Sequence, residues 1–211
     1  MRKITPFVLF GCILLVLASC SKEKSVDTLG GSGGTTAGST GSEKGTWKLL
    51  SMRGITNQTI EITDGVDVEK SVTISDYTTD NNTGTIKFDG STMTATNIGY
   101  SVDFIATGYF YTNGVLDDSL DVPFTGTIPP TSSTATYKKV GADSIYVQSG
   151  VITSVSSGGN TQSSGGGYKL KFDGDKMIMT GVVDQSKVEL NMGLTQRTIT
   201  HAVQIVTLQK Q

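Results

Sequence analysis

The chain has 211 residues, with 17 Lys and Arg against 19 Asp and Glu, so its formal charge at neutral pH is −2. Nucleic-acid binding requires a strongly basic face, and this mild acidity argues against that class of function. A single histidine and two cysteines argue against a zinc site built on histidine and thiolate ligands. The length is sufficient for a domain with a substantial hydrophobic core.

The N-terminus has the features of a secretion signal. Two basic residues precede an apolar run from Ile4 to Leu17, which is shorter than the ~20 residues that a membrane-spanning helix needs. The sequence Leu-Ala-Ser-Cys, ending at Cys20, resembles a bacterial lipobox. This resemblance implies a lipoprotein signal peptide at residues 1–19 and attachment of a diacylglycerol and a further acyl chain, such as palmitate, to Cys20. Ser21 after the cysteine resembles lipoproteins sent to the outer membrane.

A Gly, Ser and Thr-rich segment follows the predicted lipid attachment site. Residues 20–44 have too little apolar content to form a core, and their composition is typical of a disordered tether. We therefore expect the folded domain to span residues 45–211. Within the tether, Asp27-Thr28-Leu29 looks like the O-glycosylation sites of exported Bacteroidetes proteins, which makes Thr28 a candidate for modification.

From Gly45 onward, apolar residues recur at every second position, which is the period of β-strands. The segment from Ile98 to Ala106 shows this alternation clearly, and no window of a dozen residues has the spacing of an amphipathic helix. Further strands are predicted at 47–53, 72–77, 83–88, 92–97, 120–128, 134–138, 144–148, 168–172, 176–180, 188–192 and 198–210. The predicted fold class is all-β.

Two predicted hairpins have nearly the same sequence. They span 85–93 and 169–177, and each has Asp-Gly at its turn with Phe before it and Met after it. Asp-Gly is typical of tight turns because glycine adopts positive φ angles without strain. A similar turn is predicted at Asn113-Gly114, after the aromatic cluster Tyr109-Phe110-Tyr111.

Strands joined by short turns favour antiparallel neighbours, arranged as a barrel or as a sandwich. We prefer an antiparallel up-and-down β-barrel, because closure removes the exposed strand edges. Residues 156–167 contain no large apolar side chain, and the sequence predicts a long loop there.

The first predicted strand opens with Gly45-Thr46-Trp47-Lys48-Leu49. This start resembles that of the lipocalin-like lipoproteins of Bacteroidetes. The resemblance implies that Gly45 begins the first strand and that Trp47 closes one end of the barrel under a basic side chain from the last strands, for which Arg197 is the nearest candidate. The Thr-Asp-x-x-Tyr signature and the closing helix of typical lipocalins are missing, which points to a reduced bacterial variant.

If the barrel is hollow, its lining is the best candidate site for a small apolar or amphipathic ligand. The candidate lining residues are Tyr100, Val102, Phe104, Phe110, Val122, Phe124, Met177 and Met179. The alternative is that these side chains fill the barrel, since about eight strands leave room for either arrangement. A filled barrel would instead be a structural or interaction module of the cell envelope that binds a protein or a glycan.

The usual catalytic constellations are missing, so we expect no enzyme, no metal site and no cofactor. His201, the only histidine, alternates with apolar residues in the last predicted strand. It is either a packed or hydrogen-bonded barrel residue or a base whose partner the sequence does not reveal. The expected partners are a membrane, through the lipid, and a small hydrophobic ligand, with no nucleic acid, and the expected oligomeric state is a monomer.

Overall fold

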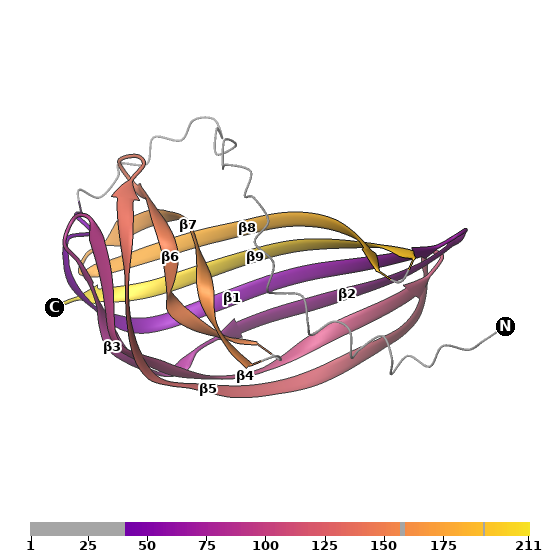
Figure 1. The fold of residues 1–211 in the computed structure, drawn as a ribbon. Coiled ribbons are helices and arrows are strands. Elements are labelled where there is room, and N and C mark those ends of the chain that lie inside the picture. The colour runs from indigo at the N-terminus through magenta and orange to yellow at the C-terminus, as the bar shows by residue number, and fades with distance from the viewer. Residues whose placement is uncertain (1–40, 157–158, 192) are drawn as a thin grey trace.

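The computed structural model describes residues 41–156, 159–191 and 193–211. The predicted signal peptide, Cys20 and Thr28 lie outside the described residues. Nine strands account for most of the described chain (Figure 1). They are β1 (Gly45–Asp64), β2 (Asp67–Thr78), β3 (Asp80–Phe88), β4 (Thr92–Thr112), β5 (Val115–Lys139), β6 (Ser144–Ser156), β7 (Gly159–Asp173), β8 (Lys176–Asn191) and β9 (Leu194–Lys210).

The nine strands form one antiparallel sheet that closes on itself where β1 pairs with β9. Strands β2 and β3 follow one another along the same side of β1, and both also pair with β4. The ring therefore has eight positions, with β2 and β3 sharing one of them. The predicted all-β, antiparallel up-and-down barrel is confirmed.

A hydrogen-bonded junction separates β2 from β3. The hydroxyl of Thr79 accepts a hydrogen bond from the Met52 amide at 2.8 Å and donates one to Asn82 Oδ1 at 2.7 Å. The Asn82 side-chain amide donates in turn to the Thr79 carbonyl. Further along β3, Gly84 has a φ of 90°, and a Cβ there would collide with the Asn97 carbonyl. These contacts stabilise a bend at which the chain passes from β2 to β3, so that the two strands together occupy one position in the barrel.

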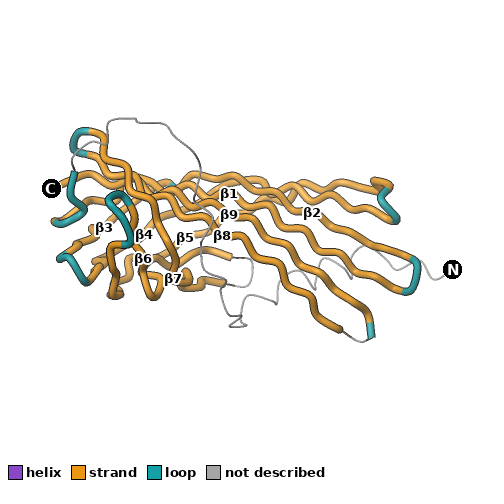
Figure 2. The backbone as a smooth tube through the Cα atoms, turned by 90° about the horizontal axis from the view of Figure 1, so that it is seen from above, coloured by secondary structure: helices purple, strands orange, loops and turns teal. Residues whose placement is uncertain are grey.

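The barrel is complete over only part of its length. We call this part the closed half; it comprises residues 41–49, 85–95, 134–147, 168–180 and 206–211. The pairing of β7 with β8 ends at Tyr168↔Gly181, and β5 pairs with β6 only at residues 137–139. The outer parts of β8, β9, β1, β2, β4 and β5 continue together as a single sheet (Figure 2). This continuation and the remaining described residues form the open half.

The predicted turns are confirmed, and the predicted long loop is wrong. Phe88 lies opposite Met93, and Phe172 lies opposite Met177, on either side of the two Asp-Gly turns. Asn113 and Gly114 both have positive φ, as a tight hairpin turn requires. Residues 159–167 belong to β7 and pair with β6. Their lack of large side chains misled the prediction, because strand pairing depends on backbone hydrogen bonds.

The hydrophobic core fills the closed half and extends to the adjoining part of the open half. Its members come from every strand except β2, and include Trp47, Ile86, Phe88, Met177 and Leu208, each at most 2% exposed. Their spacing of two along each strand points alternate side chains inward. No helix long and apolar enough to cross a membrane occurs in the described residues.

Candidate functional site

The closed end of the barrel is sealed by the chain segment that leads into β1. The Trp47 indole N–H donates to the Glu43 carbonyl at 2.7 Å, and Gly41 packs against the Phe172 ring. The Phe172 ring centre lies 6.2 Å from that of Trp47. β1 begins at Gly45 as predicted, but Glu43 is only 2% exposed, so the ordered domain includes residues that the sequence assigned to the tether.

The basic side chain over Trp47 is Lys210 and not Arg197. The Lys210 ammonium lies 5.4 Å from the indole centre, a distance suited to a cation–π contact. Arg197 lies in the open half, where its guanidinium is 3.8 Å from the Glu61 carboxylate. The resemblance predicted the type of contact, whereas the choice of Arg197 overlooked the lysine at the very end of β9.

Glu43 is a buried acid that the sequence did not reveal. Its carboxylate lies 3.0 Å from the Lys139 ammonium and accepts a hydrogen bond of 3.3 Å from the Tyr137 hydroxyl. Burial raises the pKa of Glu43, but the contacts with Lys139, the backbone and Tyr137 together outweigh it and lower that pKa. Burial and the neighbouring Glu43 charge raise the pKa of Tyr137 to about 12. The cluster therefore stabilises an ionised Glu43 at the closed end.

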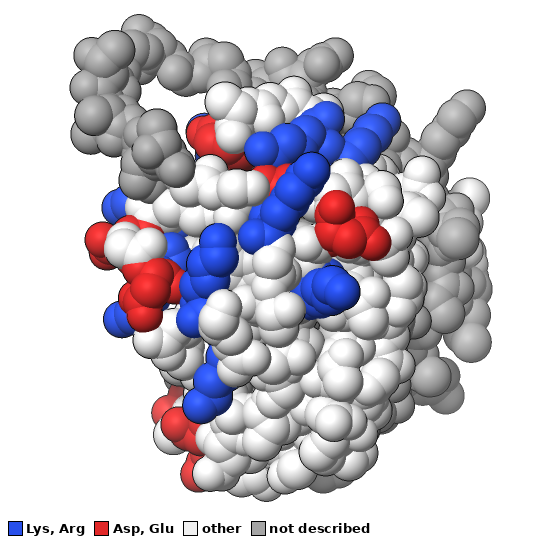
Figure 3. Space-filling model, turned by 90° about the vertical axis from the view of Figure 1, so that its left-hand side faces the viewer, with Lys and Arg blue, Asp and Glu red and all other residues white. Residues whose placement is uncertain are grey.

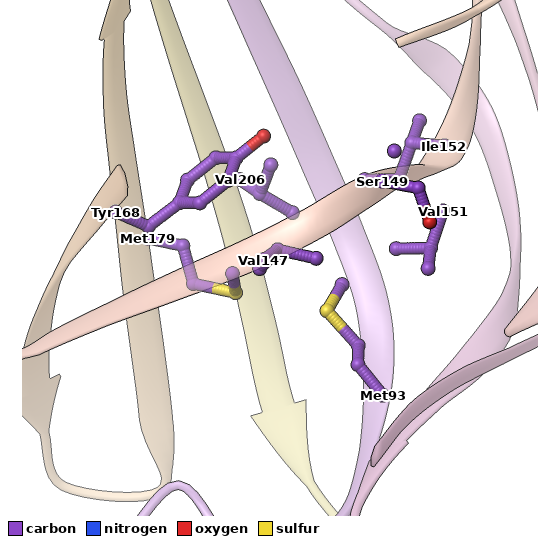
Figure 4. Close-up of a pocket in the computed structure, with 9 residues that line it drawn as sticks. Met93, Val147, Ser149, Val151, Ile152, Tyr168, Met179 and Val206 are labelled. Atoms are coloured by element: carbon purple, nitrogen blue, oxygen red, sulfur yellow. The ribbon is translucent and has the colours of Figure 1, made fainter. Parts of the chain in front are cut away.

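The eight candidate lining residues divide into two groups of four. Tyr100, Val102, Met177 and Met179 are at most 4% exposed and belong to the packed core. Met179 lines a cavity of about 10 Å³ (Figure 4), roughly the space of one water molecule. Met93, Val147, Tyr168 and Val206 are among its other lining residues. The closed half thus has no room for a ligand of lipid size. Val102 instead borders an open hollow of about 450 Å³, whose other lining residues are polar residues and a glycine of β3, β4 and β5.

The other four candidates lie farther along the inward-facing side of β4 and β5. Phe104 and Phe124 are opposite each other in the register, with ring centres 5.1 Å apart, and both are partly buried. Tyr77 of β2 stacks on Phe104 at 4.8 Å, which extends the row of aromatic rings. Phe110 and Val122 continue this face toward the tip of the open half. The row therefore lies on the open half of the sheet, beyond the part in which the barrel is complete.

Strand β8 has a free edge in the open half. Beyond Gly181 it pairs only with β9, and no other described strand lies along its second side. Val182, Val183, Val188 and Leu190 on this strand are 41–81% exposed. We call residues 182–190 the β8 edge. Unpaired backbone donors and acceptors flanked by apolar side chains are a template for a further strand.

The opposite edge of the open half, on β5, is different in character. Leu116 and Leu120 are exposed there, but Pro123 lies within the strand and lacks an amide donor. Asp117, Asp118 and Asp121 add negative charge to the same segment. Proline is one of the features by which natural sheets discourage pairing at an edge. The β8 edge also carries charge, but there Asp184 is paired with His201 and Lys187 with Glu189, and the edge contains no proline. The β8 edge is therefore the better template.

The structure supplies the partner of His201 that the sequence did not reveal. Nδ1 of His201 lies 2.5 Å from Oδ1 of Asp184 on the adjacent strand β8, and both side chains are exposed. A general base also needs a reacting group within hydrogen-bond reach, and no hydroxyl or thiol contact of His201 is observed within the described chain. No group of three or more His, Cys, Asp or Glu suited to a metal ion occurs among these residues either.

Comparison with known proteins gives no match: no protein-family model, curated protein or solved structure is significantly similar to the chain. The resemblance to lipocalin-like lipoproteins stays a prediction.

Proposed function

We propose that this chain is a lipid-anchored, non-catalytic interaction module of the cell envelope. Its anchor is Cys20 in the outer membrane, and its docking surface is the open half. The observation that carries the proposal is the contrast between the two halves: side chains fill the closed half, whereas the β8 edge and its apolar side chains have no covering strand among the described residues.

The partner that fits the β8 edge is a protein with an extended segment. Such a segment would complete the backbone hydrogen bonds of β8 and cover its side chains, as in known cases of strand addition. On one face, Val182, Val188 and Leu190 would contact alternate side chains of the added strand, because residues two apart share a face. Val183 would make the corresponding contact on the other face.

Charge at the edge provides the test of this proposal. A lysine in the middle of an edge strand disfavours pairing with a further strand. We expect Val188→Lys to reduce at least tenfold the amount of partner protein recovered with the mature lipoprotein from its native membranes. The matched control Leu120→Lys, on β5, should leave the recovery unchanged.

Hydrogen exchange of the recovered complex locates the contact. Amides of residues 182–190 should gain protection in the complex relative to the free protein. Equal recovery with both variants, or protection confined to residues outside β8, would exclude strand addition at this edge.

A second candidate function is binding of a small apolar or amphipathic ligand to the row formed by Tyr77, Phe104 and Phe124. The observation that favours it is the continuous aromatic contact between these rings on the inward-facing side of the open half. Titration with a fluorescent fatty acid tests this candidate. Saturable uptake that Phe124→Ala weakens several-fold would support it, and absence of uptake would leave strand addition as the proposed function.

The anchor has its own test. The Cys20→Ala variant should be recovered in the soluble envelope fraction, whereas the native protein should stay with the membrane. The intact mass of the native protein should exceed that of residues 20–211 by the acyl groups, and any further mass that Thr28→Ala removes would identify a glycan. A variant that stays membrane-bound would exclude Cys20 as the anchor.

A further inference from the structure

Charged side chains are divided unequally between the two halves of the barrel. The closed half carries nine lysines and five acidic residues, a net side-chain charge of +4. The open half carries four basic and twelve acidic residues, a net charge of −8. The near-neutral total of the whole chain hides this separation.

The lysines of the closed half are available to a partner. All nine are exposed: Lys44, Lys48, Lys87, Lys138, Lys139, Lys169, Lys171, Lys176 and Lys210. Figure 3 faces this end of the molecule and shows basic side chains spread over it, with acidic side chains between them. Within the described chain, Lys139 alone among them forms an ion pair, with the buried Glu43, and Lys138 and Lys210 each lie over an aromatic ring.

The acidic residues of the closed half are partly occupied by local contacts. Glu43 is buried, and Asp89 accepts hydrogen bonds from the amides of Ser91 and Thr92 in its own turn. Asp175 accepts a hydrogen bond from the Gln209 side chain. These contacts do not remove the negative charges, and Asp89, Asp143, Asp173 and Asp175 are exposed. The charge that this end presents to its surroundings is positive because its nine lysines outnumber its five acidic residues.

Three of the four basic residues of the open half, in contrast, already form ion pairs. Arg53 pairs with Asp76, Lys187 with Glu189 and Arg197 with Glu61. Lys70 lies over the Tyr111 ring, with its ammonium 4.5 Å from the ring centre. The acidic excess of the open half would repel a negatively charged surface.

We propose that the closed end of the barrel docks on an anionic lipid surface through these exposed lysines. The proposal rests on the lipid anchor proposed above, because Gly41 packs at the same end against Phe172, so the chain that leads back to Cys20 leaves from the basic end. Lysines held near anionic headgroups by an anchor are attracted to them over about one Debye length.

Docking in this way gives the domain a defined orientation. The closed half faces the lipid, and repulsion of the acidic open half directs that half away from it. The β8 edge and the hairpin tips are then presented to the surroundings of the membrane. The lipid anchor fixes the protein to the membrane, and the lysines set which end of the domain faces it.

The test uses the mature lipidated protein in vesicles, with one fluorophore on an introduced cysteine. Because Cys20 is acylated in that protein and Cys12 is removed with the signal, an introduced cysteine is its only free thiol. Ala142→Cys places the label at the closed end, and Val66→Cys places it at the β1–β2 tip of the open half. Lipids that carry a headgroup quencher report how close each label is to the surface.

In vesicles of phosphatidylcholine with about one third phosphatidylglycerol, we expect quenching of the Ala142→Cys label to be at least twofold stronger than in phosphatidylcholine alone. The Val66→Cys label should show no such increase. High salt should abolish the difference, because it screens charge interactions.

Charge variants complete the test. Combining Lys87→Gln, Lys171→Gln and Lys176→Gln should remove the dependence on phosphatidylglycerol. The matched control combines Ser119→Glu, Thr125→Glu and Thr127→Glu in the open half, which changes the net charge by the same amount. This control should keep the dependence of quenching on phosphatidylglycerol. Protein that floats with the vesicles but shows equal quenching in both lipid compositions would overturn the docking proposal while leaving the anchor intact. Protein that fails to float would overturn the anchor itself, and docking with it.

Discussion

The ammonium of Lys139 lies 3.0 Å from the carboxylate of Glu43, and the two groups differ in exposure: the Glu43 side chain is 2% exposed and that of Lys139 is 48% exposed. A buried charge that loses its partner is costly, because the remaining ion keeps its desolvation penalty. Since water reaches Lys139, the cost of removing it should be less than for a fully buried pair. We expect Lys139→Met to lower the free energy of unfolding by about 2 kcal/mol.

Urea denaturation at neutral pH measures this effect. The matched control is Lys138→Met, because Lys138 lies over the ring of Tyr146 and forms no ion pair in the described chain. Equal stability of the two variants would show that Lys139 does not compensate the charge of Glu43.

Glu43 should also make stability depend on pH. Its pKa is lowered in the folded protein from an ordinary value of 4.5, so the folded state binds this proton less readily than the unfolded state. Its contribution is fully present above about pH 4.5 and is lost as the pH falls through the lower folded pKa. We expect the difference in unfolding free energy between the native protein and Glu43→Gln to shrink between pH 6 and pH 3.

Parallel urea titrations at these pH values isolate Glu43, because the other acidic residues are common to both proteins. Asp76 and Asp89, whose pKa values are lowered mainly by hydrogen bonds from Arg53 and from the Ser91 amide respectively, contribute equally to each. A difference that stays constant with pH would mean that Glu43 is not ionised in the folded state.

The sequence predicts the fold well because strand period and turn chemistry are local. The alternation from Ile98 onward and the Asp-Gly and Asn-Gly turns each depend on a few adjacent residues, and all are confirmed. The loop predicted at 156–167 failed for the same reason, since the pairing of Ser149 with Ser164 is set by the neighbouring strand and not by local composition.

The candidate site was less accessible to sequence reasoning. Alternation correctly placed the eight candidate residues on one side of the sheet, but it carries no information on where β7 leaves β8. That point, at Gly181, separates packed residues such as Met179 from partly exposed ones such as Phe110. Glu43 and the partner of His201 were missed because both contacts join segments distant in sequence. The apolar residues Val182, Val183, Val188 and Leu190 are the sequence feature that could have drawn attention to the β8 edge.

Lys210 should affect the environment of Trp47, the only tryptophan in the chain. We expect Lys210→Ala to shift the tryptophan emission spectrum and to lower the free energy of unfolding by about 0.5–1 kcal/mol, the range for an exposed cation–π contact. Arg197→Ala should leave the spectrum unchanged, because Arg197 pairs with Glu61 in the open half. Fluorescence of the two purified variants compares them directly, and a shift confined to Arg197→Ala would reverse the assignment.

Gly84 should not tolerate a side chain. Its φ of 90° is strained for other residues, and a Cβ would collide with the backbone of β4 at Asn97, which cannot move as a side-chain tip could. We expect Gly84→Ala to lower the free energy of unfolding by at least about 2 kcal/mol. Gly166→Ala is the control, because nothing lies near its Cβ position and its φ is not positive. Thermal unfolding of both variants with equal midpoints would contradict the bend inferred at β3.

Met177 provides the direct test of whether the closed half is filled. Its side chain is fully buried, so Met177→Ala should leave a cavity and lower the free energy of unfolding by about 2–4 kcal/mol. Val122 lies on the same side of the sheet but is partly exposed in the open half. Val122→Ala should lower the free energy of unfolding by less than about 1 kcal/mol, because water replaces the lost methyl groups. Urea denaturation of both variants gives the comparison. If the closed half instead held a large solvent-filled space, truncating Met177 would remove few contacts, and its cost would fall to that of Val122.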